Sequence, residues 1–294
     1  MIKIDLVTGF LGAGKTTFIN EYVKYLKRVG ENVCVIENDY GAINVDALLV
    51  GNLCDVYMVA GGCDYDCHLR RFQTKLISIA MRGYTRVVVE PSGIYDTSEF
   101  FDSLYEDNIT QYYEIGNVFN IYDINTKGLS EDGRYILVSE MAQASKIIVS
   151  KRVKDEVVDI HYINDIFKEY MCDRIISERD ILYFDTLNMA DIINSGYCSY
   201  EHIHKLIMDN NSFDSVYIMD RHITLSQIET LKNLFKTNTY GNIIRIKGFV
   251  KEMDSWYQIN ITKNESSIKP IELGQDVVIV IGEGLNKKEI EELV

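Results

Sequence analysis

The stretch Gly9-Phe10-Leu11-Gly12-Ala13-Gly14-Lys15-Thr16-Thr17 follows the apolar run 2–7 and precedes a segment with helical spacing, 18–26. It matches the phosphate-binding loop pattern of glycine, four residues, glycine, lysine and serine or threonine. The glycines allow the backbone to fold back and point its N–H groups at an anion. We expect Lys15 to reach the β- and γ-phosphates and the Thr16 hydroxyl to hold Mg²⁺. The predicted nucleotide contacts of this loop are Gly9, Gly12, Ala13, Gly14, Lys15, Thr16 and Thr17.

Composition places the chain among ordinary globular proteins. Its 294 residues are 47% hydrophobic and 25% charged, which suffices for a real core. The excess of 44 acidic over 30 basic residues gives a net charge of −14, which disfavours a nucleic-acid partner. No apolar run approaches the roughly 18 residues of a membrane span, and Met1 leads almost directly into the first strand. We therefore expect a cytoplasmic protein without a membrane partner, whose six cysteines are reduced thiols.

Strand-like and helix-like segments alternate through the first two thirds of the chain. Strands that are apolar on both sides and separated by helices predict a parallel sheet covered on both faces. The fold class expected is α/β, a P-loop NTPase with a mostly parallel, doubly wound sheet. The strands predicted for it are 3–7, 32–36, 86–89, 117–122, 146–149 and 181–184, and an example of the helices is 68–81.

The alternation of strand-like and helix-like segments ends after Tyr197. The polar stretch 198–213 is predicted to be a linker between a nucleotide-binding domain, 1–197, and a C-terminal domain, 214–294. In the last part strands follow one another with two helices between or after them, which predicts a small α+β domain. Its expected elements are strands 215–219, 243–250, 256–261 and 277–281, a helix capped by Thr224 and a final helix 286–293.

The ordered set of motifs resembles the CobW-type GTPases, relatives of the nickel chaperones UreG and HypB. After the loop come Glu37-Asn38-Asp39-Tyr40-Gly41, then Glu90-Pro91-Ser92-Gly93, and the stretch 245–285 looks like the family's C-terminal domain. The resemblance covers nearly the whole chain. It implies a GTPase with slow intrinsic hydrolysis that binds a transition metal such as Zn²⁺, Co²⁺ or Ni²⁺ and delivers it to an unidentified client metalloprotein or metal cofactor pathway.

Two carboxylates are expected beside the phosphates. Glu90 ends a hydrophobic strand, and ligands of doubly wound sheets lie outside the carboxyl ends of strands. We predict that Glu90 and Asp39 act with Lys15 and Thr16 in catalysis and hold Mg²⁺ together with Thr16, while Gly93 brings a backbone N–H to the γ-phosphate. The alternatives are a solvated strand-end acid at Glu90 and an Asx turn at Asp39.

A candidate transition-metal site follows the second motif. The family carries Cys-x-Cys-Cys there, whereas this chain reads Gly61-Gly-Cys63-Asp-Tyr-Asp-Cys67-His68, with one residue more between the cysteines and one cysteine fewer. Thiolates and imidazole suit Zn²⁺ and other soft cations. We predict Cys63, Cys67 and His68 as ligands; the alternative is a glycine turn that leads into a helix capped by Asp66.

Base recognition departs from the GTPase pattern Asn-Lys-x-Asp. The chain reads Ser150-Lys151-Arg152-Val153, and valine cannot accept a hydrogen bond from guanine. Ser150 and Lys151 are still predicted to contact the nucleotide. GTP is favoured by the resemblance alone, and ATP stays open.

Three function classes remain from the sequence. The first is a nucleotide-gated metal carrier, for which the analogy with related P-loop proteins implies a nucleotide-dependent homodimer. The second is a regulatory or scaffold protein with little turnover and no metal transfer. The third is a small-molecule kinase, for which Arg70, Arg71 and Arg82 are available but no lid insertion is visible.

Overall fold

The computed structural model describes residues 1–39, 53–60, 65–93, 97–198, 213–219, 221–237, 239–272 and 274–293. The chain divides into two compact units, Met1–Leu206 and Ile207–Val294. This division falls inside the predicted linker 198–213, most of which lies outside the described residues, so the linker stays a prediction. None of the described helices has the length and hydrophobicity that a bilayer crossing requires.

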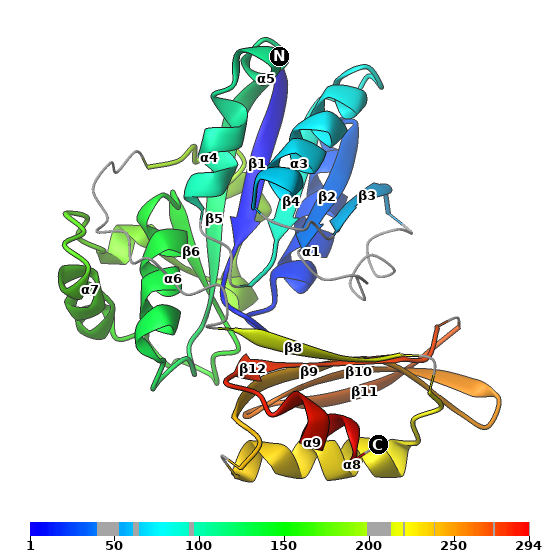
Figure 1. Ribbon diagram of the computed structural model, residues 1–294. Coiled ribbons are helices and arrows are strands. Elements are labelled where there is room, and N and C mark those ends of the chain that lie inside the picture. The colour runs from blue at the N-terminus through cyan, green and yellow to red at the C-terminus, as the bar shows by residue number, and fades with distance from the viewer. Residues whose placement is uncertain are drawn as a thin grey trace. The chain divides into compact units, whose positions relative to one another are not determined.

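The first unit is built on a parallel sheet of seven strands in the order β3-β2-β4-β1-β5-β6-β7 (Figure 1). Each described strand pair is parallel, as at Ile4, which lies beside Val87 on β4 and Ile115 on β5. Chain order reverses around β1, and this is where doubly wound sheets bind ligands, at the carboxyl ends of the strands. The strands are β1 (Ile2–Thr8), β2 (Val33–Asp39), β3 (Asp55–Ala60), β4 (Arg86–Pro91), β5 (Tyr113–Asp123), β6 (Lys146–Ser150) and β7 (Ile181–Tyr183).

Helices cover both faces of this sheet, so the strands are apolar on both sides. One core cluster joins Ile4 and Leu6 of β1 to Phe72 and Leu76 of α3. The other joins Val7 of β1 to the α1 face that carries Phe18, Tyr22 and Leu26. The helices are α1 (Lys15–Arg28), α3 (Tyr65–Ala80), α4 (Ser98–Leu104), α5 (Asp107–Thr110), α6 (Glu131–Ala142) and α7 (Ile160–Glu169), with 3₁₀ turns at Glu178–Asp180, Phe184–Thr186 and Met189–Asp191.

A buried ion pair between Asp5 and Arg86 joins strands β1 and β4. The Arg86 Nε atom lies 3.1 Å from Asp5 Oδ2, and both side chains are almost fully buried. Asp5 also accepts from the Asn117 amide at 2.7 Å and the Tyr22 hydroxyl at 2.8 Å. Burial raises the pKa of Asp5 to about 6, and the Arg86 charge limits the rise. Such a pair fixes the pairing of β1 and β4, because removing one partner would leave an uncompensated charge in the core.

The second unit is a five-stranded antiparallel sheet in the order β11-β10-β9-β12-β8. One core cluster packs Ile228 and Leu231 of α8 and Ile290 of α9 against the sheet. Thr224 caps α8 as predicted, since its hydroxyl accepts from the Gln227 amide. The elements are β8 (Asp214–Met219), α8 (Leu225–Asn233), a 3₁₀ turn at Leu234–Lys236, β9 (Asn242–Glu252), β10 (Ser255–Thr262), β11 (Ser266–Ile271), β12 (Val277–Glu283) and α9 (Lys287–Glu291).

The predicted fold class is confirmed: a parallel doubly wound sheet is followed by a separate α+β unit. Two strands were missed. β3 is an edge strand of six residues whose Met58 is 52% exposed, so it lacks the uniformly apolar pattern of the inner strands. β11 contains Pro270 and lies at the edge of its sheet, where proline is tolerated.

Candidate functional site

The loop between β1 and α1 has the backbone that its sequence predicts. Gly9, Gly12 and Gly14 all adopt positive φ, at 147°, 77° and 101°. A Cβ on Gly9 would lie 2.3 Å from the Ile121 carbonyl oxygen, so only glycine fits there. The helix α1 begins at Lys15, immediately after Gly14, and its free N–H groups and dipole favour an anion at this place.

Lys15 lies inside the loop. Its ammonium donates to the Gly9 carbonyl oxygen at 2.7 Å, and the side chain is 7% exposed. This places a positive charge against the backbone of the loop. The loop is closed further by the Ala13 amide, which donates to the Phe10 carbonyl at 3.0 Å. A buried ammonium beside backbone N–H donors is the combination that polyphosphate sites use.

Thr16 and Glu90 meet although they are 74 residues apart. The Thr16 hydroxyl donates to Glu90 Oε1 at 2.9 Å. Glu90 belongs to β4, and its neighbour in register on β2 is Glu37, which is 1% exposed. Glu37 was not assigned a role from the sequence; its position inside the second motif was the available signal. Oxygen ligands of this kind are those that Mg²⁺ prefers.

Two other residues predicted for the nucleotide site, Gly93 and Asp39, follow or end strands at this edge of the sheet. Gly93 packs on the loop backbone, since a Cβ on it would lie 2.7 Å from the Leu11 nitrogen and 2.8 Å from the Leu11 Cα. The third motif and the phosphate-binding loop are therefore in contact. Asp39 is the last residue of β2, which ends at the same edge of the sheet as β4. Its side chain lies outside the described part of the structure.

Ser150 is the last residue of β6 and Lys151 follows it, at the same edge of the sheet. The Ser150 hydroxyl lies 2.6 Å from the Ala13 carbonyl oxygen and so anchors the loop. Lys151 has a left-handed backbone, φ 58°, and its ammonium lies 3.2 Å from Asp123 Oδ2. Val153, which stands where GTPases carry the base-reading aspartate, is 71% exposed.

The predicted transition-metal ligands are only partly described. Cys63 lies outside the described residues, and Cys67 belongs to the first turn of α3 without a described side chain. His68 follows it on α3 and is 2% exposed. Within the described ranges no three His, Cys, Asp or Glu side chains gather as metal ligands would. The ligand set therefore stays a prediction.

Three described free cysteines outside that motif, Cys34, Cys54 and Cys172, are poor metal ligands. Burial raises the pKa of Cys34 far above its usual range and that of Cys54 to about 11. Burial also raises the pKa of Cys172. Because the thiolate is the form that binds metal, these three groups are held as inert thiols.

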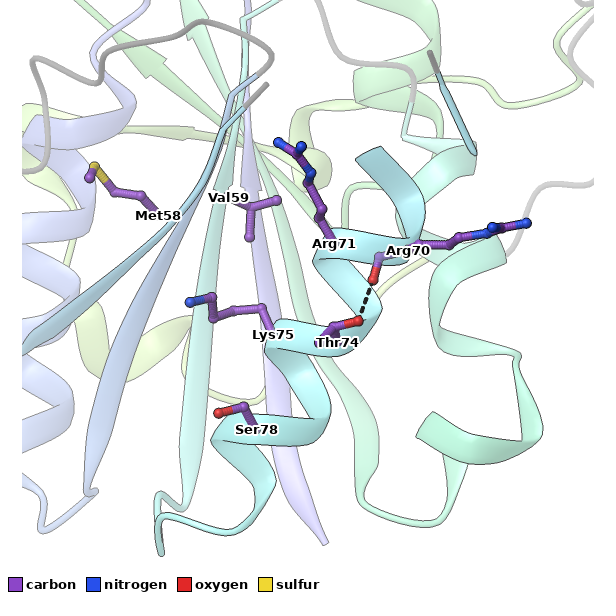
Figure 2. A pocket seen from close by; sticks show the side chains of 7 residues that line it. All are labelled: Met58, Val59, Arg70, Arg71, Thr74, Lys75 and Ser78. Carbon is purple, nitrogen blue, oxygen red and sulfur yellow. Dashed lines mark hydrogen bonds between the residues drawn. The ribbon is translucent and has the colours of Figure 1, made fainter. Parts of the chain in front are cut away.

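A cavity of about 480 Å³ lies between β3 and α3, away from the phosphate-binding loop. Figure 2 shows Arg71 and Lys75 extending from α3 to the side on which Val59 lies, whereas Arg70 points the opposite way. The Lys75 ammonium lies 5.7 Å from the centre of the Tyr57 ring. Arg71 and Lys75 stand one and two helical turns after Cys67, so the helix that carries a predicted metal ligand also presents positive charge.

One buried acid beside the loop was missed from the sequence. Glu140 on α6 is fully buried, and its pKa responds to the Lys15 charge. No local pattern marks it, because α6 is buried along most of its length and shows no polar stripe.

Comparisons with known proteins agree with this geometry. A family model described as the CobW/HypB/UreG nucleotide-binding domain matches residues 3–170. The zinc chaperone YjiA of Escherichia coli (strain K12) is 25% identical over 169 residues, which cover 54% of this chain and 52% of YjiA. The zinc chaperone YeiR of the same organism is 31% identical over 106 residues, 35% of this chain and 32% of YeiR. The match thus spans about half of YjiA and a third of YeiR.

Solved structures with similar chains include Zn(II)-bound YjiA GTPase from E. coli, with a TM-score of 0.39 and 15% identity over 99% of this chain and 97% of that one. Another is the hydrogenase maturation factor HypB from Archaeoglobus fulgidus, with a TM-score of 0.43 and 12% identity over 66% of this chain and 87% of that one. The assignment to a family rests on the match over residues 3–170.

Proposed function

The chain belongs to the CobW/HypB/UreG family of nucleotide-binding domains, and from this premise we propose that it is a GTPase metallochaperone. In this proposal it binds GTP with Mg²⁺, hydrolyses it slowly, and passes a transition metal to a client metalloprotein or metal cofactor pathway in the cytoplasm. The observation that carries the proposal is the 2.9 Å hydrogen bond between Thr16 and Glu90, which joins the phosphate-binding loop to the carboxylate of the third motif.

Phosphoryl transfer to water needs positioning and charge neutralisation more than covalent chemistry. Lys15 moves from the Gly9 carbonyl to the β- and γ-phosphates, and the loop amides hold the phosphate oxygens. Thr16 and Glu90, with Asp39 at the end of β2, would hold Mg²⁺. When bound, Mg²⁺ neutralises negative charge that develops on the phosphates. Gly93, which packs against the Leu11 backbone, would donate its amide to the γ-phosphate.

The metal cargo is proposed to bind at Cys63, Cys67 and His68. Two thiolates and one imidazole leave a fourth position of a tetrahedral Zn²⁺ open, which suits transfer better than storage. The names of the relatives YjiA and YeiR favour zinc, with Co²⁺ and Ni²⁺ as further candidates. The motif lies between the second and third nucleotide motifs in the sequence, so hydrolysis can change its geometry and release the metal.

The remaining sequence expectations complete the proposal. Residues 1–197 would form the nucleotide-binding domain, 198–213 a linker, and 214–294 a domain that contacts the client. A nucleotide-dependent homodimer would complete the site. Ser150 and Lys151 would border the base, with Lys151 stacking along it; because Val153 offers no acceptor, discrimination between GTP and ATP would be weak.

The experiment measures phosphate release from GTP and Zn²⁺ uptake by the full chain under reducing conditions. We expect Zn²⁺ binding that is lost in the double variant Cys63→Ser/Cys67→Ser and kept in the control Cys198→Ser, a free cysteine of the described region. Uptake that is the same in the double variant would refute the metal site. Titration of GTP, ATP and their diphosphates tests the base preference, which much tighter ATP binding would overturn.

The second candidate is a nucleotide-binding scaffold with little turnover and no metal transfer. It is favoured by the departures at Val153 and in the Cys63–Cys67 motif. Tight nucleotide binding without hydrolysis, with or without Zn²⁺, would support this candidate, whereas Zn²⁺-stimulated phosphate release would support the metallochaperone.

A further inference from the structure

Glu140 is a carboxylic acid in the interior of the first unit. It lies on α6 and is 0% exposed. Neither of its oxygens makes a hydrogen bond of regular geometry to the described part of the chain. Burying an ionised carboxylate without compensation is costly, so such a group is kept where it interacts with another charge or carries a proton.

The surroundings of Glu140 are the base of the phosphate-binding loop. The Thr8 hydroxyl, the Gly9 amide and the Lys15 charge all act to lower the pKa of Glu140, while burial raises it to about 8. Thr8 pairs in register with Asn120 of β5, and both side chains are fully buried and neutral. Lys15, whose charge favours the ionised form of the acid, donates its ammonium to the Gly9 carbonyl at 2.7 Å.

The turn of α6 that carries Glu140 is fixed in place. The Thr97 hydroxyl donates to the Ser139 carbonyl oxygen at 2.7 Å, and the Thr97 amide donates to the Ser139 hydroxyl at 3.2 Å. Thr97 follows the third motif, which ends at Gly93. One turn of α6 thus carries both Ser139, which is bonded to the segment after that motif, and Glu140, which interacts electrostatically with the Lys15 charge.

We propose that Glu140 is a positioning residue of the nucleotide site: it holds Lys15 and the Thr8–Gly9 turn in place while the loop is empty, and yields Lys15 to the phosphates when a nucleotide binds. The inference rests on the proposed nucleotide function. Once the phosphates neutralise Lys15, the carboxylate loses the positive charge that favours its ionised form. It then takes up a proton from the solvent, and the neutral acid does not repel the phosphates.

The direct experiment is calorimetry of the full chain with GTP and Mg²⁺ at pH 8.5, in buffers that differ in ionisation enthalpy. We expect net uptake of a fraction of one proton by the wild-type protein. Affinity should fall as the pH rises from 7 to 9, by up to about tenfold for each unit by which nucleotide raises the pKa. In Glu140→Gln the uptake disappears and the affinity changes less than about twofold over this range, since the side chain no longer titrates.

Two further variants separate positioning from packing. Glu140→Asp keeps the acid and should keep part of the proton uptake. Glu131→Gln removes an exposed acid from the same helix and should leave both uptake and affinity as in the wild type. Equal pH profiles in the wild type and Glu140→Gln, or no proton uptake by the wild type, would overturn the inference while the nucleotide function stands. A wild-type protein that binds no nucleotide at any pH would overturn both.

Discussion

Gly93→Ala tests the contact between the third motif and the phosphate-binding loop. A Cβ at this position would lie 2.7 Å from the Leu11 nitrogen and 2.8 Å from its Cα. The shorter approach is about 0.7 Å less than an ordinary contact of 3.4 Å. The atoms in the way belong to the backbone, so no side-chain rotation relieves the clash, and either the loop or the segment at Gly93 must move.

The size of the effect follows from that displacement. Overpacking of a tight contact costs about 1–3 kcal/mol. If the nucleotide-bound loop bears this cost, GTP binding weakens by about tenfold to a hundredfold. Phosphate release should fall at least as much, because a displacement near 1 Å of groups that position a substrate can cost about a hundredfold in rate.

The assay is GTP affinity by calorimetry, paired with phosphate release and thermal unfolding. Gly83→Ala is the matched control. Gly83 has a positive φ of 79°, and a Cβ on it would meet nothing within 4 Å. The control should lose about 1 kcal/mol of stability to backbone strain and keep its GTP affinity.

Two outcomes would contradict a role of this contact in nucleotide binding. If Gly93→Ala binds and hydrolyses GTP within about twofold of the wild type, and unfolds at the same temperature, the close approach of Gly93 to Leu11 is not a feature of the working protein. If Gly83→Ala loses as much affinity as Gly93→Ala, the effect is a general loss of stability and not a property of the contact.

Three further predictions concern the same site. Glu90→Gln should abolish the Mg²⁺ dependence of GTP binding while the protein stays folded, because an amide still accepts from Thr16 but carries no charge; unchanged Mg²⁺ dependence in a magnesium titration would contradict it. Glu140→Gln should stabilise the protein at pH 8 but not at pH 4.5. The pKa of Glu140 is about 8 in the folded protein and 4.5 in the unfolded chain, so the free energy of unfolding of the wild type is highest below pH 4.5 and falls by on the order of 4 kcal/mol as the pH rises through 8. Melting temperatures of both proteins across this pH range would show the difference. Ser150→Ala should weaken GTP binding by about fivefold through loss of the hydrogen bond to Ala13, and affinity equal to the wild type would contradict the anchoring role.

The fold was largely readable from the sequence because the apolar strands and the loop glycines obey local rules. The parallel sheet follows from strands that are buried on both faces, such as β4 with all six residues buried. Strand β3 was not predicted from the sequence because an edge strand is partly exposed, as Met58 is, and its residues do not form a uniformly apolar run. Similarly, β11 contains a proline, which argues against a strand unless its position at an edge is known.

The site was predictable to the extent that its residues belong to contiguous motifs. Lys15, Thr16 and Glu90 come from such motifs, and the structure brings Thr16 to Glu90. Glu140 belongs to no motif: it comes from a helix that is far away in sequence and is buried along most of its length. Its importance depends on which neighbours the fold supplies, and no periodicity or spacing encodes that.

The turn after β1 is proposed to bind a nucleotide through its polyphosphate, and the affinity of Lys15→Ala for GTP is the sharpest test of this binding. Lys15 is 7% exposed and bonded to the loop at 2.7 Å, whereas Lys24 of the same helix is half exposed and pairs only with Glu21 in the described structure. We predict that Lys15→Ala loses at least a hundredfold in GTP affinity, on the order of 3 kcal/mol, while Lys24→Ala binds as the wild type does. Full affinity in folded Lys15→Ala would contradict the account.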